Sequence, residues 1–367
     1  MPINRRQFVL LGSLTLSAAA ATAACSQTPS KATANPTPPH TSSNPNNEIA
    51  QTAIGPTGLF APQRGDIRIA IISDLNNAYG ATDYLPQVTQ GISLLPDWQP
   101  DLVLCSGDTI AGQSLDLSEA QIEAMWTAFD DKILAPIRAA QLPFAIAIGN
   151  HDASSYQNNG EFVYIADRQA ATQYWQGHQA DTNITFIEAA AFPFHYSFKQ
   201  NNIFYLIWDA SSANIPAEQI AWANRALSSP AAQTADRRIV MGHLPLYAVA
   251  KKRDRPGEFL NQADELKALL ERHNVHTYIS GHHHAYFPGK TGQLNTLHAG
   301  ALGSGPKQLL SSTIPPFQTL TIMDLFLDTA STTYTTYNMN TLAVVDPQTL
   351  PAEIVGPNGR EQRQDLA

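Results

Sequence analysis

The sequence contains few cysteines, few charged residues and no excess of basic residues. Only 2 of its 367 residues are cysteine, which excludes a fold held together by a framework of disulfides. Charged residues make up 14% of the chain, with 22 Lys and Arg against 31 Asp and Glu and a net charge of −9. No stretch combines basic and aromatic residues, so we expect no nucleic-acid polymer as a partner. A composition of 43% hydrophobic residues with 25 Pro and 21 Gly predicts a globular protein with long loops.

The first 24 residues have the pattern of an export signal. Arg5 and Arg6 precede an uncharged apolar run from Phe8 to Ala24, which is typical of a twin-arginine signal peptide. A single-pass membrane anchor is the alternative, but a run of about 17 residues barely reaches the length of a membrane span. We therefore expect export to the periplasm or the cell surface and removal of residues 1–24, which takes away two arginines and changes the net charge to −11.

Cys25 directly follows three small residues, Thr22, Ala23 and Ala24. A cysteine in this place resembles the lipid-modified first residue of a bacterial lipoprotein. Leu is usual in that pattern where Thr22 stands, so the sequence leaves open whether Cys25 carries a lipid anchor. A single lipid on a flexible tether would hold the protein at a membrane without inserting it.

The globular domain is predicted to span residues 64–350. Residues 25–63 are mostly Ser, Thr, Asn, Pro and Ala with almost no large apolar residue, and such a segment is predicted to be a disordered tether. Residues 351–367 are again polar and contain Pro and Gly, so we expect them to form a C-terminal tail outside the domain.

Six short apolar runs inside this domain each end in a polar residue. Continuous Val, Ile and Leu runs favour strands that are buried on both faces, and in α/β sheets the chemistry collects beyond the carboxyl ends of the strands. We therefore expect the six run ends to converge. The runs cover residues 67–72, 102–105, 144–148, 203–208, 239–241 and 277–279, and the polar residues that follow are Asp74, Asp108, Asn150 with His151, Asp209, His243, and His282 to His284.

Helical periodicity lies between these runs, over residues 119–140, 161–175, 217–227 and 263–273. Helices that alternate with buried strands indicate an α/β fold. After Ala285 the apolar residues alternate in shorter segments, which we expect to be antiparallel strands that complete a second sheet. These segments cover residues 294–298, 317–327 and 331–338. The predicted architecture is a four-layer α/β/β/α sandwich of two mixed sheets flanked by helices.

Carboxylates, a carboxamide oxygen and imidazoles form a ligand set that suits Zn, Fe, Mn or Mg. Taken singly, an Asp after a strand is often a turn or cap residue, and a lone His is often structural. Taken together, the residues favour a metal site. A glycine stands directly before Asp108, Asn150, His243 and His282, and its missing side chain allows the close approach of backbone to a bound ion or phosphate.

Five blocks in this order resemble those of the calcineurin-like metallophosphoesterases, over residues 64–300. They are Asp74, Gly107-Asp108, Gly149-Asn150-His151-Asp152, Gly242-His243 and Gly281-His282-His283-His284. Asp209, followed by Glu218, Gln219 and Trp222, looks like a segment of bacterial members near the cyclic-nucleotide phosphodiesterase and acid phosphatase branches. The resemblance implies an exported, metal-dependent phosphoric ester hydrolase that acts on small-molecule phosphate mono- or diesters.

The resemblance also implies the role of each residue in a site with two metal ions, which can be Mn, Fe, Zn or Mg. Asp108 would bridge the two ions, which at about 3.5–4 Å apart generate a bridging hydroxide for attack on the phosphorus. His151 resembles the imidazole that contacts a phosphoryl oxygen or protonates the leaving group. Asp152 is expected to orient His151 or to cap the turn. The remaining ligands would be Asp74 and His284 for the first metal and Asn150, His243 and His282 for the second.

One position departs from the family pattern. The first block usually reads Asp-x-His, and its third residue here is Asn76. In purple acid phosphatases, where that His is also absent, a Tyr three residues after the bridging Asp completes the first metal, and here that residue is Ala111. We therefore expect the Asn76 amide oxygen, a water or Tyr79 to complete the first site, or that site to bind its ion weakly. The departure also motivates an alternative function, a metal-binding but catalytically weak surface lipoprotein that acts as a binding module.

Residues around the blocks are expected to shape the site. His283 lies between two ligands and is predicted to point away as a rim residue, and His298 is predicted to be a packed histidine. The basic residues of segment 251–255 follow the His243 block and either meet a substrate phosphate or form a solvated loop. The loops at 153–160 and 251–256 are expected to set the choice between monoester and diester, which the sequence leaves open.

Overall fold

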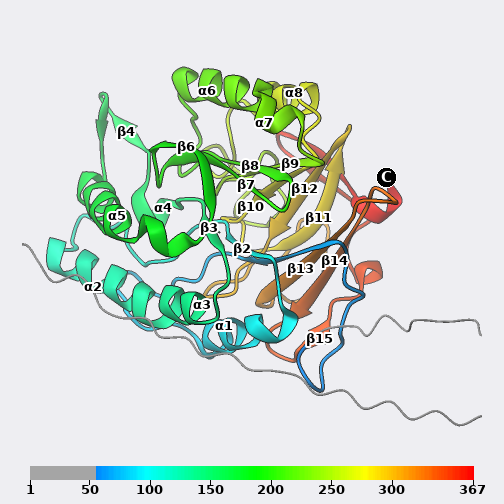
Figure 1. Cartoon of the computed structure of the whole chain (residues 1–367). Coiled ribbons are helices and arrows are strands. Elements are labelled where there is room, and N and C mark those ends of the chain that lie inside the picture. Colours follow the sequence, from blue (N-terminus) through cyan, green and yellow to red (C-terminus); the bar gives the residue numbers. More distant parts are fainter. Residues whose placement is uncertain (1–54) are drawn as a thin grey trace, which may run out of the picture. The chain divides into compact units, whose positions relative to one another are not determined.

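The computed structural model describes residues 55–367 (Figure 1). The predicted signal peptide, Cys25 and most of the predicted tether lie outside these described residues. Within them, no helix is both long and apolar enough to cross a membrane.

Most strands belong to two sheets. The six-stranded sheet has the order β15-β14-β13-β1-β2-β3, and the nine-stranded sheet has the order β16-β17-β11-β12-β10-β9-β8-β7-β6. The strands are β1 (Ile67–Ile72), β2 (Leu102–Cys105), β3 (Phe144–Ile146), β6 (Thr185–Ala191), β7 (His195–Gln200), β8 (Ile203–Ile207), β9 (Arg237–Met241), β10 (Thr277–Ser280), β11 (Tyr286–Thr291), β12 (Leu294–Ala299), β13 (Thr319–Phe326), β14 (Ser331–Asn338), β15 (Ala343–Val344), β16 (Glu353–Gly356) and β17 (Gly359–Arg363), with a separate hairpin of β4 (Gln157–Asn158) and β5 (Glu161–Phe162).

Both sheets are mixed. Strands β1, β2 and β3 are parallel, as are β8, β9, β10 and β12. Their carboxyl ends therefore lie along one edge of each sheet. The strands that were predicted to end in candidate ligands all belong to these two parallel groups.

Helices cover the outer face of each sheet. In Figure 1, α6, α7 and α8 lie above the strands and α1, α2 and α3 lie below them. The helices are α1 (Pro86–Trp98), α2 (Glu119–Phe129), α3 (Ala135–Ala139), α4 (Asn150–Ala153), α5 (Ile165–His178), α6 (Ala217–Ser228), α7 (Pro230–Gln233) and α8 (Ala263–Arg272). This arrangement confirms the predicted four-layer α/β/β/α sandwich.

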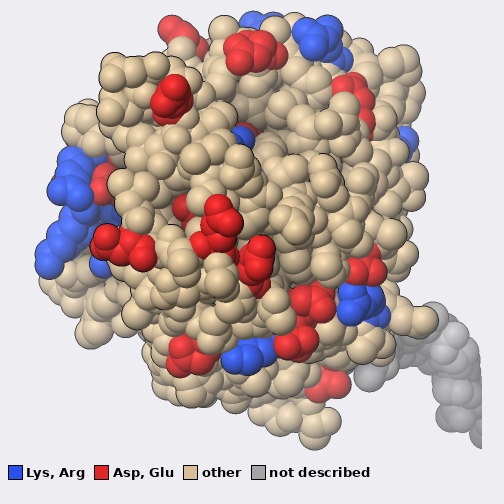
Figure 2. Space-filling model, turned by 90° about the vertical axis from the view of Figure 1, so that its left-hand side faces the viewer, with Lys and Arg blue, Asp and Glu red and all other residues tan. Residues whose placement is uncertain are grey.

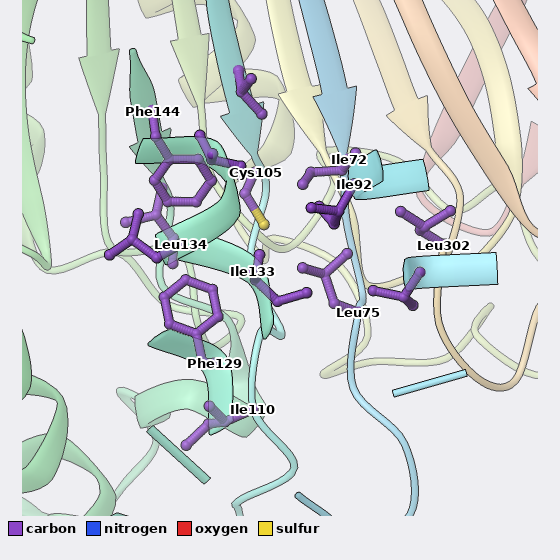
Figure 3. Close-up of a cluster of buried hydrophobic side chains, with 14 of the residues drawn as sticks. Ile72, Leu75, Ile92, Cys105, Ile110, Phe129, Ile133, Leu134, Phe144 and Leu302 are labelled. Carbon is purple, nitrogen blue, oxygen red and sulfur yellow. The ribbon is translucent and has the colours of Figure 1, made fainter. Parts of the chain in front are cut away.

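Three apolar clusters fill the spaces between the four layers. Neighbouring residues of a strand face opposite sides of its sheet, so one strand contributes to two of these clusters. In β1, Ile69 and Ile71 face the cluster between the two sheets, whereas Ile72 faces the cluster under α1, α2 and α3. Figure 3 shows part of this second cluster, in which Cys105 packs near Ile72 and Ile133. A third cluster joins the nine-stranded sheet to α6, α7 and α8. The full burial of both faces explains why these strands read as continuous apolar runs.

The structure corrects several predicted boundaries. Residues 351–367 are not a tail, since β16 and β17 form a hairpin that pairs with β11. The domain also starts earlier than residue 64, because the Tyr337 hydroxyl donates a hydrogen bond to the Phe60 carbonyl. Residues 351–367 are polar in sequence, and pairing with the sheet overrides that pattern.

Two other element predictions were wrong. The segment at 119–140 was predicted as one helix, but a π-helical turn at Asp130–Leu134 separates α2 from α3. The segments 317–327 and 331–338 were assigned to the second sheet, yet β13 and β14 extend the first sheet, because β13 pairs antiparallel with β1. A buried ion pair of Arg68 with Asp324, at 2.9 Å, joins the two strands.

Candidate metal centre

The predicted ligands lie in the loops that leave the carboxyl ends of the parallel strands. Asp74 follows β1, Asp108 follows β2, and Asn150 follows β3 as the first residue of α4. His243 follows β9, and His282 and His284 follow β10. The site therefore draws on both sheets, as the convergence of the apolar runs predicts.

Two groups of side chains in this place could each hold a metal ion, and they share one residue. The first contains Asp74, Asp108 and His284, and the second contains Asp108, His243 and His282. Within each group the candidate ligand atoms lie within 4.8 Å of one another. Asp108 belongs to both groups, which is the arrangement that a carboxylate bridging two ions requires.

Asn150 extends the second group. Its Oδ1 lies 3.0 Å from Nε2 of His243 and 2.8 Å from Nδ1 of His282. Its Nδ2 donates a hydrogen bond of 2.6 Å to Oε1 of Gln113, which turns the amide oxygen toward the two imidazoles. Gln113 was not predicted, because nothing in the sequence links it to Asn150.

Asn76 lies next to the first group and has an unsatisfied acceptor. Its backbone N–H donates to the Asp108 carbonyl at 3.1 Å, and its side chain is 5% exposed. Its Oδ1 is buried and accepts no hydrogen bond from any residue within 55–367. Buried acceptors are normally paired, so this oxygen fits a ligand of an ion in the first group.

In three imidazoles, one ring nitrogen contacts a carbonyl or carboxylate and the other faces the candidate ligands, as is usual for histidines that bind metal. His243 directs Nδ1 to the Ser106 carbonyl at 2.8 Å, and His284 directs Nδ1 to the Gly305 carbonyl at 3.0 Å, which leaves Nε2 of both rings facing the carboxylates. His282 directs Nε2 to the Glu258 carboxylate at 3.0 Å, which leaves Nδ1 facing Asn150. Glu258 was not predicted either, since no spacing in the sequence relates it to His282.

The electrostatics of the site favour cations. Burial alone would raise the pKa of Asp74, but His284 and His243 lower it below its usual value. The pKa of Asp108 is also lowered, because His243 and His151 outweigh burial. Burial lowers the pKa of His282 to about 4, so this imidazole is neutral, as a ligand must be.

The loops that carry the ligands have an unusual backbone. Asp74, Asp108, His282 and His284 all have a positive φ, between 51° and 61°. A non-glycine residue in this region costs of order 1–3 kcal/mol and is often found at functional sites. The glycine before Asn150 is needed for space, since a Cβ on Gly149 would overlap the Asp108 carboxylate.

His151 lies beside the two groups without joining either. Its backbone N–H donates to Oδ1 of Asp108 at 2.8 Å, and its Nδ1 lies 3.0 Å from the Gly112 carbonyl. Its ring packs against Tyr79, with the centroids 5.1 Å apart, and Tyr79 is 64% exposed. Nε2 of His151 forms no hydrogen bond within the described chain, so it is the ring nitrogen free to meet a substrate.

Asp152 does not orient His151, which corrects that prediction. It is fully buried, and its two oxygens accept hydrogen bonds from the backbone N–H groups of Asp108, Thr109, Ile110 and Gly149. Because it caps α4 and ties the loop after β2 to the loop after β3, its contribution is to position Asp108. The alternative of a cap, which the sequence left open, describes it better.

Three further residues lie away from the ligand atoms. His283 is completely buried rather than at the rim, because its Nε2 donates to the Glu258 carbonyl at 2.9 Å. His298 is packed, as predicted, and pairs with Glu361 at 2.7 Å. Asp209 pairs with Arg168 at 2.9 Å and belongs to neither ligand group.

Comparison with known proteins agrees with this geometry. The model of the calcineurin-like phosphoesterase family matches residues 67–286, which is more than half of the chain and includes every residue of both ligand groups. The chain belongs to this family. Members of the calcineurin-like family use a dinuclear metal centre, and the two groups that share Asp108 are its counterpart here.

A solved structure shows the same fold. A purple acid phosphatase from seeds of yellow lupin (Lupinus luteus) is 17% identical, with a TM-score of 0.52, over 76% of this chain and 52% of that protein. The chain thus spans about half the length of the lupin phosphatase. A dimetal phosphatase from Danio rerio is 13% identical, with a TM-score of 0.47, over 71% of this chain and 93% of that protein. No curated protein matches the sequence.

A cavity of about 560 Å³ opens beside the second ligand group of this family member. Asn150 and His282 line one part of it, and Tyr156, Arg253 and Glu258 line others. The loops 153–160 and 251–256, which were predicted to shape the site, both contribute to its walls. The cavity is large enough for the organic part of a small phosphoester.

Proposed function

We propose that this protein hydrolyses small-molecule phosphate monoesters or diesters at a centre of two metal ions. The observation that carries the proposal is the sharing of Asp108 by two groups of buried ligands. When bound, two ions about 3.5–4 Å apart supply an activated water as nucleophile and neutralise charge on the phosphoryl oxygens.

The ligands divide between the two ions according to their contacts. Asp74 and His284, whose ligand atoms are 3.1 Å apart, would hold the first ion together with the amide oxygen of Asn76. Asn150, His243 and His282 would hold the second ion, since Oδ1 of Asn150 lies 3.0 Å from Nε2 of His243 and 2.8 Å from Nδ1 of His282. Asp108 completes both sets.

His151 transfers the proton in this proposal. The Gly112 carbonyl holds Nδ1 as a donor in both protonation states of the ring, so Nε2 is the nitrogen that gains and loses a proton. The contact of its backbone N–H with Asp108 keeps the ring next to the ligands. Nε2 can therefore donate to the leaving-group oxygen, or to a phosphoryl oxygen.

The surface supports a small substrate rather than a polymer. On the face drawn in Figure 2, acidic side chains are scattered, basic side chains gather at the left edge, and most of the surface is uncharged. A nucleic-acid polymer needs a continuous basic track, which this face does not offer.

Export is part of the proposal and is supported by the sequence alone. The Arg5-Arg6 pair and the apolar run to Ala24 match a twin-arginine signal, and this route carries folded proteins that already hold a metal. Replacement of both arginines by lysine should leave the precursor in the cytoplasm. Unimpaired secretion of that variant would contradict the route. Mass analysis of the secreted chain tests for a lipid at Cys25.

The experiment that tests the activity is a parallel assay on metal-free protein. Mn, Zn, Fe or Mg is added, and hydrolysis of an aryl phosphate monoester and an aryl phosphate diester is followed side by side. We expect activity that depends on added metal and saturates at two equivalents, and the ratio of the two rates gives the substrate class. Hydrolysis that survives complete removal of metal, or no hydrolysis of either ester with any metal, would contradict the proposal.

A further inference from the structure

A second cavity, of about 400 Å³, adjoins the cavity beside the ligand groups. Tyr156, Ser212 and Asn214 line both cavities, so the two spaces meet at these side chains. We name the cavity that Asn150 and His282 line the near cavity, and the second one the far cavity. Both volumes fall in the range of about 300–1,000 Å³ that is usual for small-molecule sites. An organic group that extends from the ligands beyond the near cavity therefore meets Tyr156.

The backbone of Tyr156 is held on both sides. Its N–H donates to Oγ of Ser154 at 3.2 Å, and its carbonyl accepts from the N–H of Val163 at 3.1 Å, across the β4–β5 hairpin. The N–H of the preceding residue, Ser155, donates to Oγ of Ser211 at 2.9 Å. Ser154 and Ser211 are both buried. These bonds fix the start of the hairpin, which projects from the domain on the side of α4 and α5 (Figure 1).

The side chain of Tyr156, in contrast, has no partner. It is 56% exposed, its ring contacts no other aromatic ring of residues 55–367, and its hydroxyl forms no hydrogen bond with them. Single exposed apolar residues are common on protein surfaces, and exposure alone indicates no site. What distinguishes Tyr156 is its place in the wall of both cavities. A tyrosine on a fixed backbone offers a flat contact surface at a low cost in conformational entropy.

The far cavity has aromatic walls and no unpaired positive charge. Phe162 and Phe194 line it, and the guanidinium of Arg168 lies 4.3 Å and 3.9 Å from the centroids of their rings. Arg168 pairs with Asp209 at 2.9 Å. Glu218 also lines the cavity and forms no ion pair within the described part of the chain. Such walls favour an aromatic group without negative charge.

We propose that the organic part of the substrate carries a planar, uncharged aromatic group, which stacks on Tyr156 and extends into the far cavity. The inference rests on the proposed function, because that function places the phosphoester at the ligand groups beside the near cavity. Tyr156 then determines which organic groups the enzyme prefers. A stacked aromatic contact strengthens binding by about two- to tenfold beyond the effect of burial alone.

The test compares two ligands that are not hydrolysed and that differ only in their outer ring. Biphenyl-4-ylphosphonate has a flat outer ring, whereas 4-cyclohexylphenylphosphonate has a puckered ring of similar size. Each is titrated into the manganese-loaded protein, and Kd is measured by calorimetry. We expect the biphenyl ligand to bind the wild type about fivefold more tightly, and this preference should fall below about twofold in Tyr156→Leu, which keeps an apolar side chain but removes the flat ring.

Two variants serve as controls. Tyr156→Phe removes only the hydroxyl and should keep the preference. Phe60→Leu makes the same kind of change as Tyr156→Leu at a side chain that is 59% exposed and lines neither cavity, and it should also keep the preference. Because the Tyr156 side chain is exposed, the urea midpoint of Tyr156→Leu should stay close to that of the wild type.

A third ligand tests the charge of the aromatic group. In 4′-carboxybiphenyl-4-ylphosphonate the outer ring carries a carboxylate, for which the far cavity has no unpaired cation. It should bind more weakly than biphenyl-4-ylphosphonate. Tighter binding of the carboxylated ligand would contradict the proposal that the group is uncharged.

The outcomes separate the inference from the proposed function. Equal Kd values for the biphenyl and cyclohexylphenyl ligands in the wild type, no binding of either, or an unchanged preference in Tyr156→Leu would overturn the aromatic site even in a protein that hydrolyses phosphoesters. A preference that requires the ring of Tyr156, in a protein that hydrolyses no phosphoester, would support the aromatic site and refute the proposed activity.

Discussion

Substitution of Asn76 by Leu should change stability in opposite directions with and without metal. The two side chains have similar size, and the substitution leaves untouched the backbone N–H of Asn76, which donates to the Asp108 carbonyl. Oδ1 of Asn76 is buried and accepts no hydrogen bond from residues 55–367. A buried acceptor in this state costs about 1–3 kcal/mol, so its removal should raise the free energy of unfolding by up to about 2 kcal/mol.

With metal bound, the same oxygen has a partner. If this oxygen is a ligand of the first ion, its loss should lower the affinity for that ion by about tenfold or more. An ion that binds tenfold more weakly stabilises the metal-saturated protein by about 1.4 kcal/mol less. The sign of the change in unfolding free energy should therefore reverse between the two states.

Urea unfolding of the wild type and Asn76→Leu, with chelator or with saturating Mn, measures this reversal. The control is Gln219→Met, because the buried amide of Gln219 accepts from the Asp209 N–H at 2.7 Å and does not touch the ligands. It should lower stability equally in both states. If Asn76→Leu destabilises the metal-free protein as much as the metal-loaded one, Asn76 is an ordinary structural residue and not a ligand.

Three further predictions test other parts of the structure. His151→Ala should keep both metals and lower turnover by about a hundredfold or more, and a loss of metal content would make His151 a ligand instead. Asp324→Ala leaves Arg68 charged and buried, so chemical denaturation should show a loss of about 3–5 kcal/mol, and a loss below 1 kcal/mol would show that water reaches the pair. Burial and Arg237 lower the pKa of His276 from 6.5 to about 4. As the pH falls, the unfolded chain therefore binds a proton at this residue before the folded protein does. The free energy of unfolding should decrease as the pH is lowered from 6.5 to 4, by at most about 3 kcal/mol. His276→Gln should flatten that part of the stability curve, and an unchanged curve would mean that another group causes the loss.

The sequence predicts that the candidate ligands lie together, because each one follows a strand that is buried on both faces. Burial makes runs such as Ile67–Ile72 continuously apolar, and parallel strands end at the same edge, so the order of residues along the chain is enough to place Asp74 and Asp108 together. The other candidate ligands follow from their residue types and from their order along the chain. Asn76 is an example, since the departure from the family pattern draws attention to a residue whose side-chain oxygen accepts no hydrogen bond in the part of the chain that the structure describes.

Other contacts depend on loops whose path the sequence does not encode locally. Gln113 and Glu258 position two ligands, but each lies in a long loop and meets its partner only in the folded protein. Asp152 was predicted to act on the adjacent His151, whereas its side chain turns into the backbone of the loop after β2. The hairpin of β16 and β17 was missed because polar residues at a sheet edge have no distinctive pattern.

The proposed function requires Asp108 to bridge two ions. The most direct measurement is anomalous diffraction at the manganese edge from crystals grown with Mn²⁺, for the wild type and for Asp108→Asn. The wild type should show two peaks about 3.5–4 Å apart with the Asp108 carboxylate between them, and both peaks should weaken in the variant. A single peak in the wild type, or two full peaks that persist in Asp108→Asn, would contradict the account.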